Sequence, residues 1–233
     1  MSQRVAKEAQ NQVQLDTYEE RGAVRLGPWT SHIWRTDPRH LGFLLARYKF
    51  VAKMLTGKRA VLELGCGDGV GMPVVLQTVE TIHGIDLEPA VVEDAQARFA
   101  KEGETRCTFA VHDITVEPLA SPFDAVYSLD VIEHIPPALE GNFMANLSHS
   151  LREHGMCIMG TPNVEAKEHA SEGSRAGHIN LKSAETLRPL LLRYFHHALI
   201  FSMNDEIVHT GFSPMAHYLI GIGIEVNEEA LRG

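Results

Sequence analysis

The sequence has 233 residues, 44% of them hydrophobic, and carries 21 Lys and Arg against 30 Asp and Glu, a formal net charge of −9. This length fits one domain, or one domain with a lid, and buries enough surface to need no disulfides. The acidic balance disfavours non-specific nucleic-acid binding, which depends on Lys and Arg neutralising phosphates. No apolar run is long enough to cross a membrane, and the polar N-terminus is unlike a signal peptide.

The cysteines Cys66, Cys107 and Cys157 are too few and too scattered for a disulfide framework or a zinc knuckle. Free thiols are typical of reducing compartments, so we expect a cytoplasmic protein.

Residues 1–37 are expected to form an N-terminal arm or a helical lid, and residues 38–233 the main domain. Within the main domain, apolar periodicity predicts an alternation of helix and strand. The expected helices cover residues 38–55, 73–79, 89–101 and 136–151, and the expected strands 60–64, 81–86, 107–111, 123–128 and 155–160. Such alternation predicts an α/β fold with a doubly wound, mostly parallel sheet, which binds ligands at the carboxyl ends of its strands.

The pattern changes after Asn163. Residues 164–178 are polar and are expected to form a loop. A short helix over 183–192, with Ser183 as its N-cap, and strands over 195–202 and 216–226 complete the predicted elements.

A glycine-rich turn follows the first predicted strand, with Gly65, Gly67 and Gly69 at alternate positions. Glycine allows positive φ and close approach of a ligand, although a plain tight turn uses it too. Asp86 ends the second strand, where a carboxylate can bind ribose hydroxyls or merely cap the next helix. Asp113 ends the third strand, within reach of an adenine amine or simply as a turn residue. Together these features predict an adenosine site that lacks the dinucleotide and P-loop fingerprints.

Four segments of the sequence together form a recognisable series of motifs: VLELGCGDG, HGIDLEP, HDI and FDAVYSLDVIEHI. Their order and spacing, between Arg59 and Asn163, resemble the motif series of class I S-adenosylmethionine-dependent methyltransferases. The later run GHINLKSAETLRPLLLRYF resembles the small-molecule branch, in which the ubiquinone-pathway O-methyltransferases are the nearest well-known members. The resemblance implies a Rossmann-like, seven-stranded sheet with a final antiparallel strand. It also implies S-adenosyl-L-methionine as cofactor and S-adenosyl-L-homocysteine as product.

The resemblance also implies a role for each matching position. The amino-acid part of the cofactor would be lined by Glu63, Gly65, Cys66, Gly67 and Gly69. The adenosine would be held by Asp86, Leu87, Asp113 and Ile114, and the methionine end would be covered by residues 128–130, including Leu129.

Methyl transfer from a sulfonium mainly requires alignment of the reacting atoms and exclusion of water. A hydroxyl acceptor also needs a group that takes its proton. His134, just after the fourth strand, and His178, at the end of the polar loop, are the catalytic candidates. For each of them, a histidine that only binds nearby backbone is the alternative.

Asp130, Glu133, His134 and His178 resemble the divalent-metal site of some O-methyltransferases of ubiquinone synthesis and RNA 3′-end methylation. Mixed oxygen and nitrogen ligands suit Mg²⁺ or Mn²⁺. The same run is common in metal-free relatives, and Asp130 replaces the usual glutamate. A divalent metal is therefore an alternative that the sequence does not favour, and we assign no metal ligands.

Trp29, His32 and Trp34 precede the first long helix and are candidates for the acceptor pocket, unless this segment docks without touching a ligand. We predict methyl transfer to a small polar acceptor, at a hydroxyl oxygen of a sugar or natural product, with no membrane partner and a homodimer possible. One alternative is an N-methyltransferase, or an RNA or protein methyltransferase using the arginines of the first quarter. Another is a non-catalytic S-adenosylmethionine-binding module.

Overall fold

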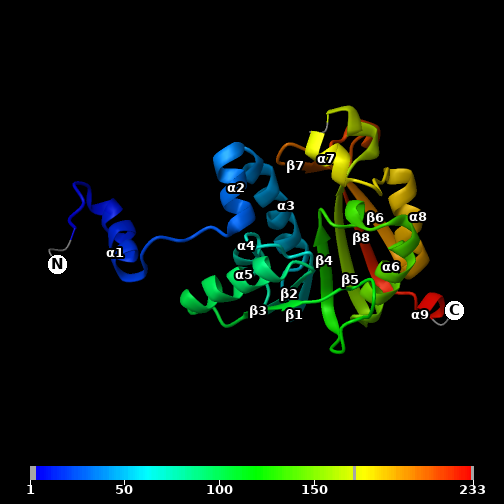
Figure 1. The fold of residues 1–233 in the computed structure, drawn as a ribbon, viewed down its shortest axis with the longest axis horizontal. Helices are drawn as coiled ribbons and strands as arrows, with labels where there is room; N and C mark the ends of the chain where they lie inside the picture. Colours follow the sequence, from blue (N-terminus) through cyan, green and yellow to red (C-terminus); the bar gives the residue numbers. More distant parts are fainter. Residues whose placement is uncertain (1–3, 170–171, 232–233) are drawn as a thin grey trace.

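Eight strands form one mixed sheet in the computed structural model, which describes residues 4–169 and 172–231 (Figure 1). Their order across the sheet is β3 (Cys107–Val111), β2 (Thr81–Asp86), β1 (Ala60–Leu64), β4 (Phe123–Leu129), β5 (Leu151–Pro162), β8 (Tyr218–Val226), β6 (Phe195–Asn204) and β7 (Ile207–His209). Strands β3 to β5 run parallel, and β8 lies antiparallel between β5 and β6. The doubly wound, mostly parallel sheet is therefore confirmed, as is the late antiparallel strand.

The expected number of seven strands is wrong, because β7 adds an eighth at the edge of the sheet. This strand has only three residues and pairs antiparallel with β6 across a tight turn, in which Asp205 has a φ of 48°. A segment so short shows too little alternation of apolar and polar residues to be recognised in a sequence.

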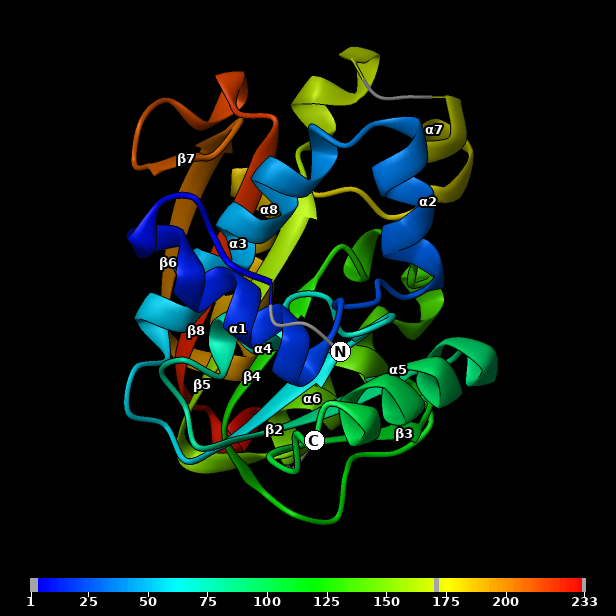
Figure 2. The same ribbon diagram turned by 90° about the vertical axis from the view of Figure 1, so that its left-hand side faces the viewer.

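Helices cover both faces of the sheet (Figure 2). One face packs against α3 (His40–Met54), α4 (Met72–Val75) and α5 (Pro89–Lys101), and the other against α6 (Glu140–His149) and α8 (Ala184–Tyr194). Successive strand residues point to opposite faces, so Val61 belongs to the first core and Leu62 to the second. This alternation explains why the parallel strands read as continuous apolar runs.

Several helices differ from the expected ranges. Helix α4 ends at Val75, and the chain then forms turns, whereas a helix to residue 79 was expected. The loop expected over 164–178 is wrong in part, because this segment contains a 3-10 helix (Val164–His169) and α7 (Glu172–Gly177). Ser183 caps α8 as expected, since its side chain accepts a hydrogen bond from the backbone of Thr186 in a capping box.

The N-terminal segment divides into two parts. Helix α1 (Gln12–Arg21), preceded by a 3-10 turn (Ala9–Asn11), has no buried residue and stands apart from the sheet in Figure 1. Helix α2 (Pro28–Thr36) instead packs beside α3. Other short helices are the 3-10 turns Ile132–His134, Pro137–Leu139 and Ser213–Met215, and α9 (Glu228–Leu231). Among the described residues, no helix has both the length and the hydropathy to span a bilayer.

Candidate active site

The glycine turn between β1 and α4 requires glycine at the positions that the sequence singles out. Gly65, Gly67 and Gly69 have φ values of 70°, 51° and 71°, in the left-handed region that L side chains avoid. A Cβ on Gly65 would lie 2.3 Å from a methyl group of Val131, and one on Gly67 would lie 2.9 Å from the Trp29 ring. The turn is therefore fixed both by backbone conformation and by close packing.

A cavity of about 280 Å³ lies at the carboxyl ends of β1, β2 and β4. Its walls combine all four residues expected around adenosine with residues beyond β4. They are Trp29, Leu64, Gly65, Ile85, Asp86, Leu87, His112, Asp113, Ile114, Thr115, Asp130, Val131, His134 and Ile135. We call this space the cofactor cavity. Of the expected cofactor contacts, Glu63, Cys66, Gly67, Gly69 and Leu129 do not line it.

Asp86 and Asp113 each hold the backbone around this cavity. The Asp86 carboxylate accepts hydrogen bonds from the backbone N–H of Gly67 at 2.8 Å and of Glu88 at 3.0 Å. Asp113 accepts from the N–H of Thr115 at 2.9 Å. Each carboxylate oxygen can accept more than one hydrogen bond, so a structural role here leaves capacity for a ligand.

Glu63 lies below the turn, with its side chain in the core between β1 and α3. Its carboxylate accepts hydrogen bonds from the hydroxyl groups of Tyr48, at 2.9 Å, and Tyr127, at 2.7 Å. Only 1% of the residue is exposed, and burial raises the pKa of the carboxyl to about 8 although both hydroxyls favour its charged form. The carboxyl is therefore mainly protonated near neutral pH.

A second cavity, of about 320 Å³, lies beside the carboxyl ends of β5 and β6 and the start of β8. Its lining mixes aromatic and aliphatic side chains with cationic and titratable ones. The lining residues are Phe43, Arg47, Pro162, Asn163, Ala166, Lys167, His178, Leu181, Met203, Asp205, His217 and Tyr218. We call this space the acceptor cavity, after the role proposed for it below.

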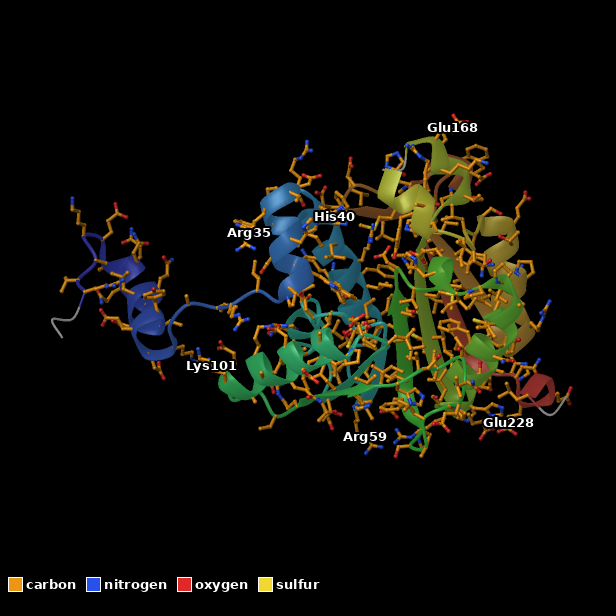
Figure 3. All side chains as sticks on the ribbon, in the orientation of Figure 1. Arg35, His40, Arg59, Lys101, Glu168 and Glu228 are labelled. Carbon is orange, nitrogen blue, oxygen red and sulfur yellow. The ribbon has the colours of Figure 1, made fainter. Side chains whose placement is uncertain are left out.

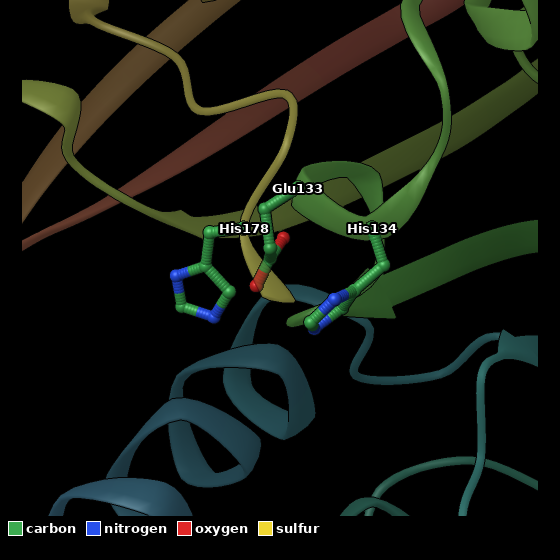
Figure 4. Close-up of side chains that lie close together, drawn as sticks. All are labelled: Glu133, His134 and His178. Atoms are coloured by element: carbon green, nitrogen blue, oxygen red, sulfur yellow. The ribbon is translucent and has the colours of Figure 1, made fainter. Parts of the chain in front are cut away.

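Glu133, His134 and His178 lie close together (Figure 4), and His134 lines the cofactor cavity while His178 lines the acceptor cavity. One donor atom from each lies within 4.8 Å of the others, and the two imidazole rings meet edge to face at 5.1 Å. The Glu133 side chain is fully buried. One of its carboxylate oxygens accepts from the Thr161 hydroxyl at 3.0 Å, and the other has no hydrogen-bond partner among the described residues. Both predicted catalytic histidines are thus brought to one place.

An ion pair also joins a residue that lines the cofactor cavity to one that lines the acceptor cavity. Asp130, at the end of β4, pairs with a guanidinium nitrogen of Arg47 on α3 at 2.5 Å. The guanidinium also stacks on the ring of Tyr218, 3.7 Å from its centroid. Asp130 and His134 line the cofactor cavity. Their neighbours Arg47 and His178 line the acceptor cavity. The two cavities therefore share a wall made of four polar side chains.

The donor set of this wall does not fit a divalent ion well. Mg²⁺ and Mn²⁺ favour several oxygen ligands, and Mg²⁺ in particular demands a nearly regular octahedron. Glu133 offers one buried carboxylate, and Asp130, the neighbouring carboxylate in the sequence pattern, is bound by Arg47. A third group, His134, has its Nδ1 within 3.0 Å of the Gly177 carbonyl oxygen.

Part of the chain is similar to known methyltransferases. Residues 61–155 match a family model described as "Methyltransferase domain". A ubiquinone biosynthesis O-methyltransferase of Psychrobacter arcticus is 27% identical over 141 residues, which cover 58% of this chain and 53% of that protein. Residues 61–155, about two fifths of the chain, are therefore similar to methyltransferase domains. The chain spans about half the length of the curated relatives that it matches.

Solved structures agree with the methyltransferase fold. The methyltransferase domain of bacterial CtHen1-C has a TM-score of 0.65 and 19% identity, covering 78% of this chain and 98% of that one. The N-methyltransferase NodS from Bradyrhizobium japonicum, solved in complex with S-adenosyl-l-homocysteine, has a TM-score of 0.62 and 16% identity, covering 90% and 97%. At these identities the likeness concerns the fold.

The N-terminal residues expected around the acceptor lie elsewhere in the structure. Trp29 lines the cofactor cavity, whereas His32 is exposed and Trp34 lines a separate surface hollow. Helix α2 is held on the glycine turn by Thr30, whose N–H and hydroxyl donate to the Asp68 carboxylate at 2.8 and 2.7 Å. Figure 3 shows Arg35, on the same helix, turned outward.

From the sequence, Arg47 is considered only among the arginines of an RNA or protein methyltransferase, and Tyr218 is not assigned to the site. Arg47 lies within the apolar periodicity of α3, and only 8% of it is exposed. A lysine or arginine in a helix is normally solvated, so its burial depends on a counterion that is distant in sequence. Asp130 is that counterion, and its left-handed φ of 58° is the local sign that the residue is specially placed.

Proposed function

We propose that this protein is a methyltransferase that transfers the methyl group of S-adenosylmethionine to a hydroxyl oxygen of a small polar acceptor. The observation that carries the proposal is the shared wall between the cofactor and acceptor cavities. The wall would hold a methyl donor in one cavity next to a nucleophile in the other, and its side chains would have to part for the two to meet. Such positioning contributes roughly 7–11 kcal/mol to methyl transfer and similar reactions.

The cofactor cavity suits an adenosyl group. Asp86 places a carboxylate at the end of β2, where ribose hydroxyls can donate to it, and Leu87 and Ile114 offer apolar surface for adenine. Trp29 adds an aromatic wall from α2. Bound there, S-adenosylmethionine supplies an electrophilic methyl carbon on a sulfonium.

His178 is our candidate for the group that takes the acceptor proton. It lines the acceptor cavity, and burial lowers the pKa of its imidazole, with a smaller effect from His134 in the same direction. A histidine with a lowered pKa is neutral at physiological pH and can accept a proton. The acceptor O–H would lose its proton to the imidazole as the oxygen bonds to the methyl carbon and the carbon–sulfur bond breaks, leaving S-adenosylhomocysteine.

A cavity of about 320 Å³ supports a small acceptor, such as a monosaccharide unit or an aromatic natural product. An amine acceptor, an RNA or protein acceptor, and binding of the cofactor without catalysis are the competing functions. One structural neighbour is an N-methyltransferase, which supports an amine as the first alternative acceptor.

The test is calorimetric titration with S-adenosylmethionine, followed by a mass-spectrometric methylation assay on small alcohols, phenols, carboxylic acids and amines. The cofactor should bind, and a hydroxyl acceptor should gain one methyl group. Asp86→Asn should weaken cofactor binding by roughly 1.5–3 kcal/mol, the value of hydrogen bonds to a charged group, and Asp16→Asn on α1 is the matched control. Binding without methylation of any acceptor would favour a non-catalytic module, and methylation of amines alone would move the reaction to nitrogen.

A further inference from the structure

The Arg47–Asp130 ion pair connects the two cavities in which the proposed reactants would lie. The guanidinium borders the acceptor cavity, and the carboxylate borders the cofactor cavity. Under the proposed function, a negative charge develops on the acceptor oxygen while a positive charge sits on the cofactor sulfur. The pair therefore presents to each reactant the charge opposite to its own.

Arg47 is fixed in this position from several sides. Its guanidinium lies between Asp130, at 2.5 Å, and the face of Tyr218, at 3.7 Å from the ring centroid, with the Phe43 ring at 5.7 Å. Aromatic faces attract cations, and a guanidinium keeps its proton when buried. Its Nε is buried and has no hydrogen-bond partner among the described residues. A permanent positive charge therefore borders the acceptor cavity.

Because Asp130 is paired with Arg47, its carboxylate is not available as a metal ligand beside Glu133, His134 and His178. These three residues already place one donor atom each within 4.8 Å of the others. Asp130 precedes Glu133 by three residues in the sequence. If its carboxylate were free, it would be the second carboxylate of a divalent-ion site. Arg47 occupies the carboxylate that such a site would need.

We propose that Arg47 is a built-in cation that takes the place of a divalent metal ion in this site. It holds Asp130 beside the cofactor cavity, and its own charge makes an acceptor hydroxyl easier to ionise. The effect of the Arg47 charge on the acceptor hydroxyl rests on the proposed function. The claim that the site does not bind a divalent metal is independent of that function.

The decisive experiment is a Mn²⁺ titration of the protein without any acceptor, in which electron paramagnetic resonance measures the free Mn²⁺. Wild-type protein should leave Mn²⁺ free. Arg47→Met should release Asp130 and create a site that binds Mn²⁺ at least about tenfold more tightly. Arg47→Lys, which keeps the charge, should behave as wild type, and the double variant R47M/D130N should lose the gained site. The exposed Arg39→Met serves as the control for loss of a surface arginine.

Saturable Mn²⁺ binding by wild type that Glu133→Gln abolishes would overturn the proposal, as would a folded Arg47→Met protein with no gain. The wild-type measurement needs no substitution, so it remains decisive even if Arg47→Met fails to fold. Calorimetry with S-adenosylmethionine on the same samples separates the two claims. Absence of cofactor binding would refute the proposed function and leave the Mn²⁺ result standing.

Discussion

Replacing Glu63 by glutamine should flatten the dependence of stability on pH. The pKa of the buried carboxyl is about 8 in the native protein, against an ordinary value of 4.5. Between these values the unfolded chain releases a proton that the native protein keeps, so the free energy of unfolding falls as the pH rises. The slope is about −1.4 kcal/mol per pH unit, and it is lost progressively as the pH passes about 8. Glutamine does not titrate, and its amide can still bond to both Tyr48 and Tyr127.

Urea unfolding followed by circular dichroism at about pH 6.5 and about pH 7.5 measures the effect. Wild type should lose about 1.2 kcal/mol more than Glu63→Gln over this interval, because the carboxyl is still mostly protonated at both ends. Glu133, whose pKa burial and the charge of Asp130 also raise to about 8, contributes a similar slope that both proteins retain. Glu19→Gln, on the exposed α1, is the matched control. If Glu63→Gln kept the full wild-type slope, the carboxyl would be ionised in the core and the reasoning would be wrong.

The remaining predictions concern the reaction and the glycine turn. His178→Asn should lower kcat/KM for a hydroxyl acceptor by about 10²–10⁴-fold while calorimetry shows unchanged cofactor affinity, and an unaltered rate would remove His178 as the base. Gly65→Ala should destabilise the fold by more than Gly57→Ala in urea unfolding. Both glycines have positive φ, which costs alanine about 1–2 kcal/mol, but only Gly65 meets a neighbour, 2.3 Å away. Equal losses would show that Val131 moves aside freely.

The strands and the glycine turn could be predicted because their signals are local. Each parallel strand is a short apolar run, and Gly65 to Gly69 follow the first of them directly. His134 and His178 were singled out by the chemistry of their neighbours in sequence. Their meeting at one wall depends on the segment after β5 folding back, for which the sequence of this segment, expected to be a loop, gave no indication.

Contacts between distant segments account for what could not be predicted. Glu63 matches a cofactor-lining position by its place in the motif, yet its side chain is enclosed by tyrosines from α3 and β4. The pairing of Arg47 with Asp130 joins residues 83 positions apart. A pattern of residue types along the chain does not specify which of several possible partners a buried polar group will find.

Helix α3 carries two of these contacts on consecutive residues, since Arg47 binds Asp130 and Tyr48 binds Glu63. One inserted or deleted residue earlier in the helix would turn both side chains by about 100° and shift them by about 1.5 Å along the axis. The helix is therefore locked in register against the ends of β1 and β4. Changes of length in this protein are expected to be tolerated before residue 28 and not between residues 40 and 48.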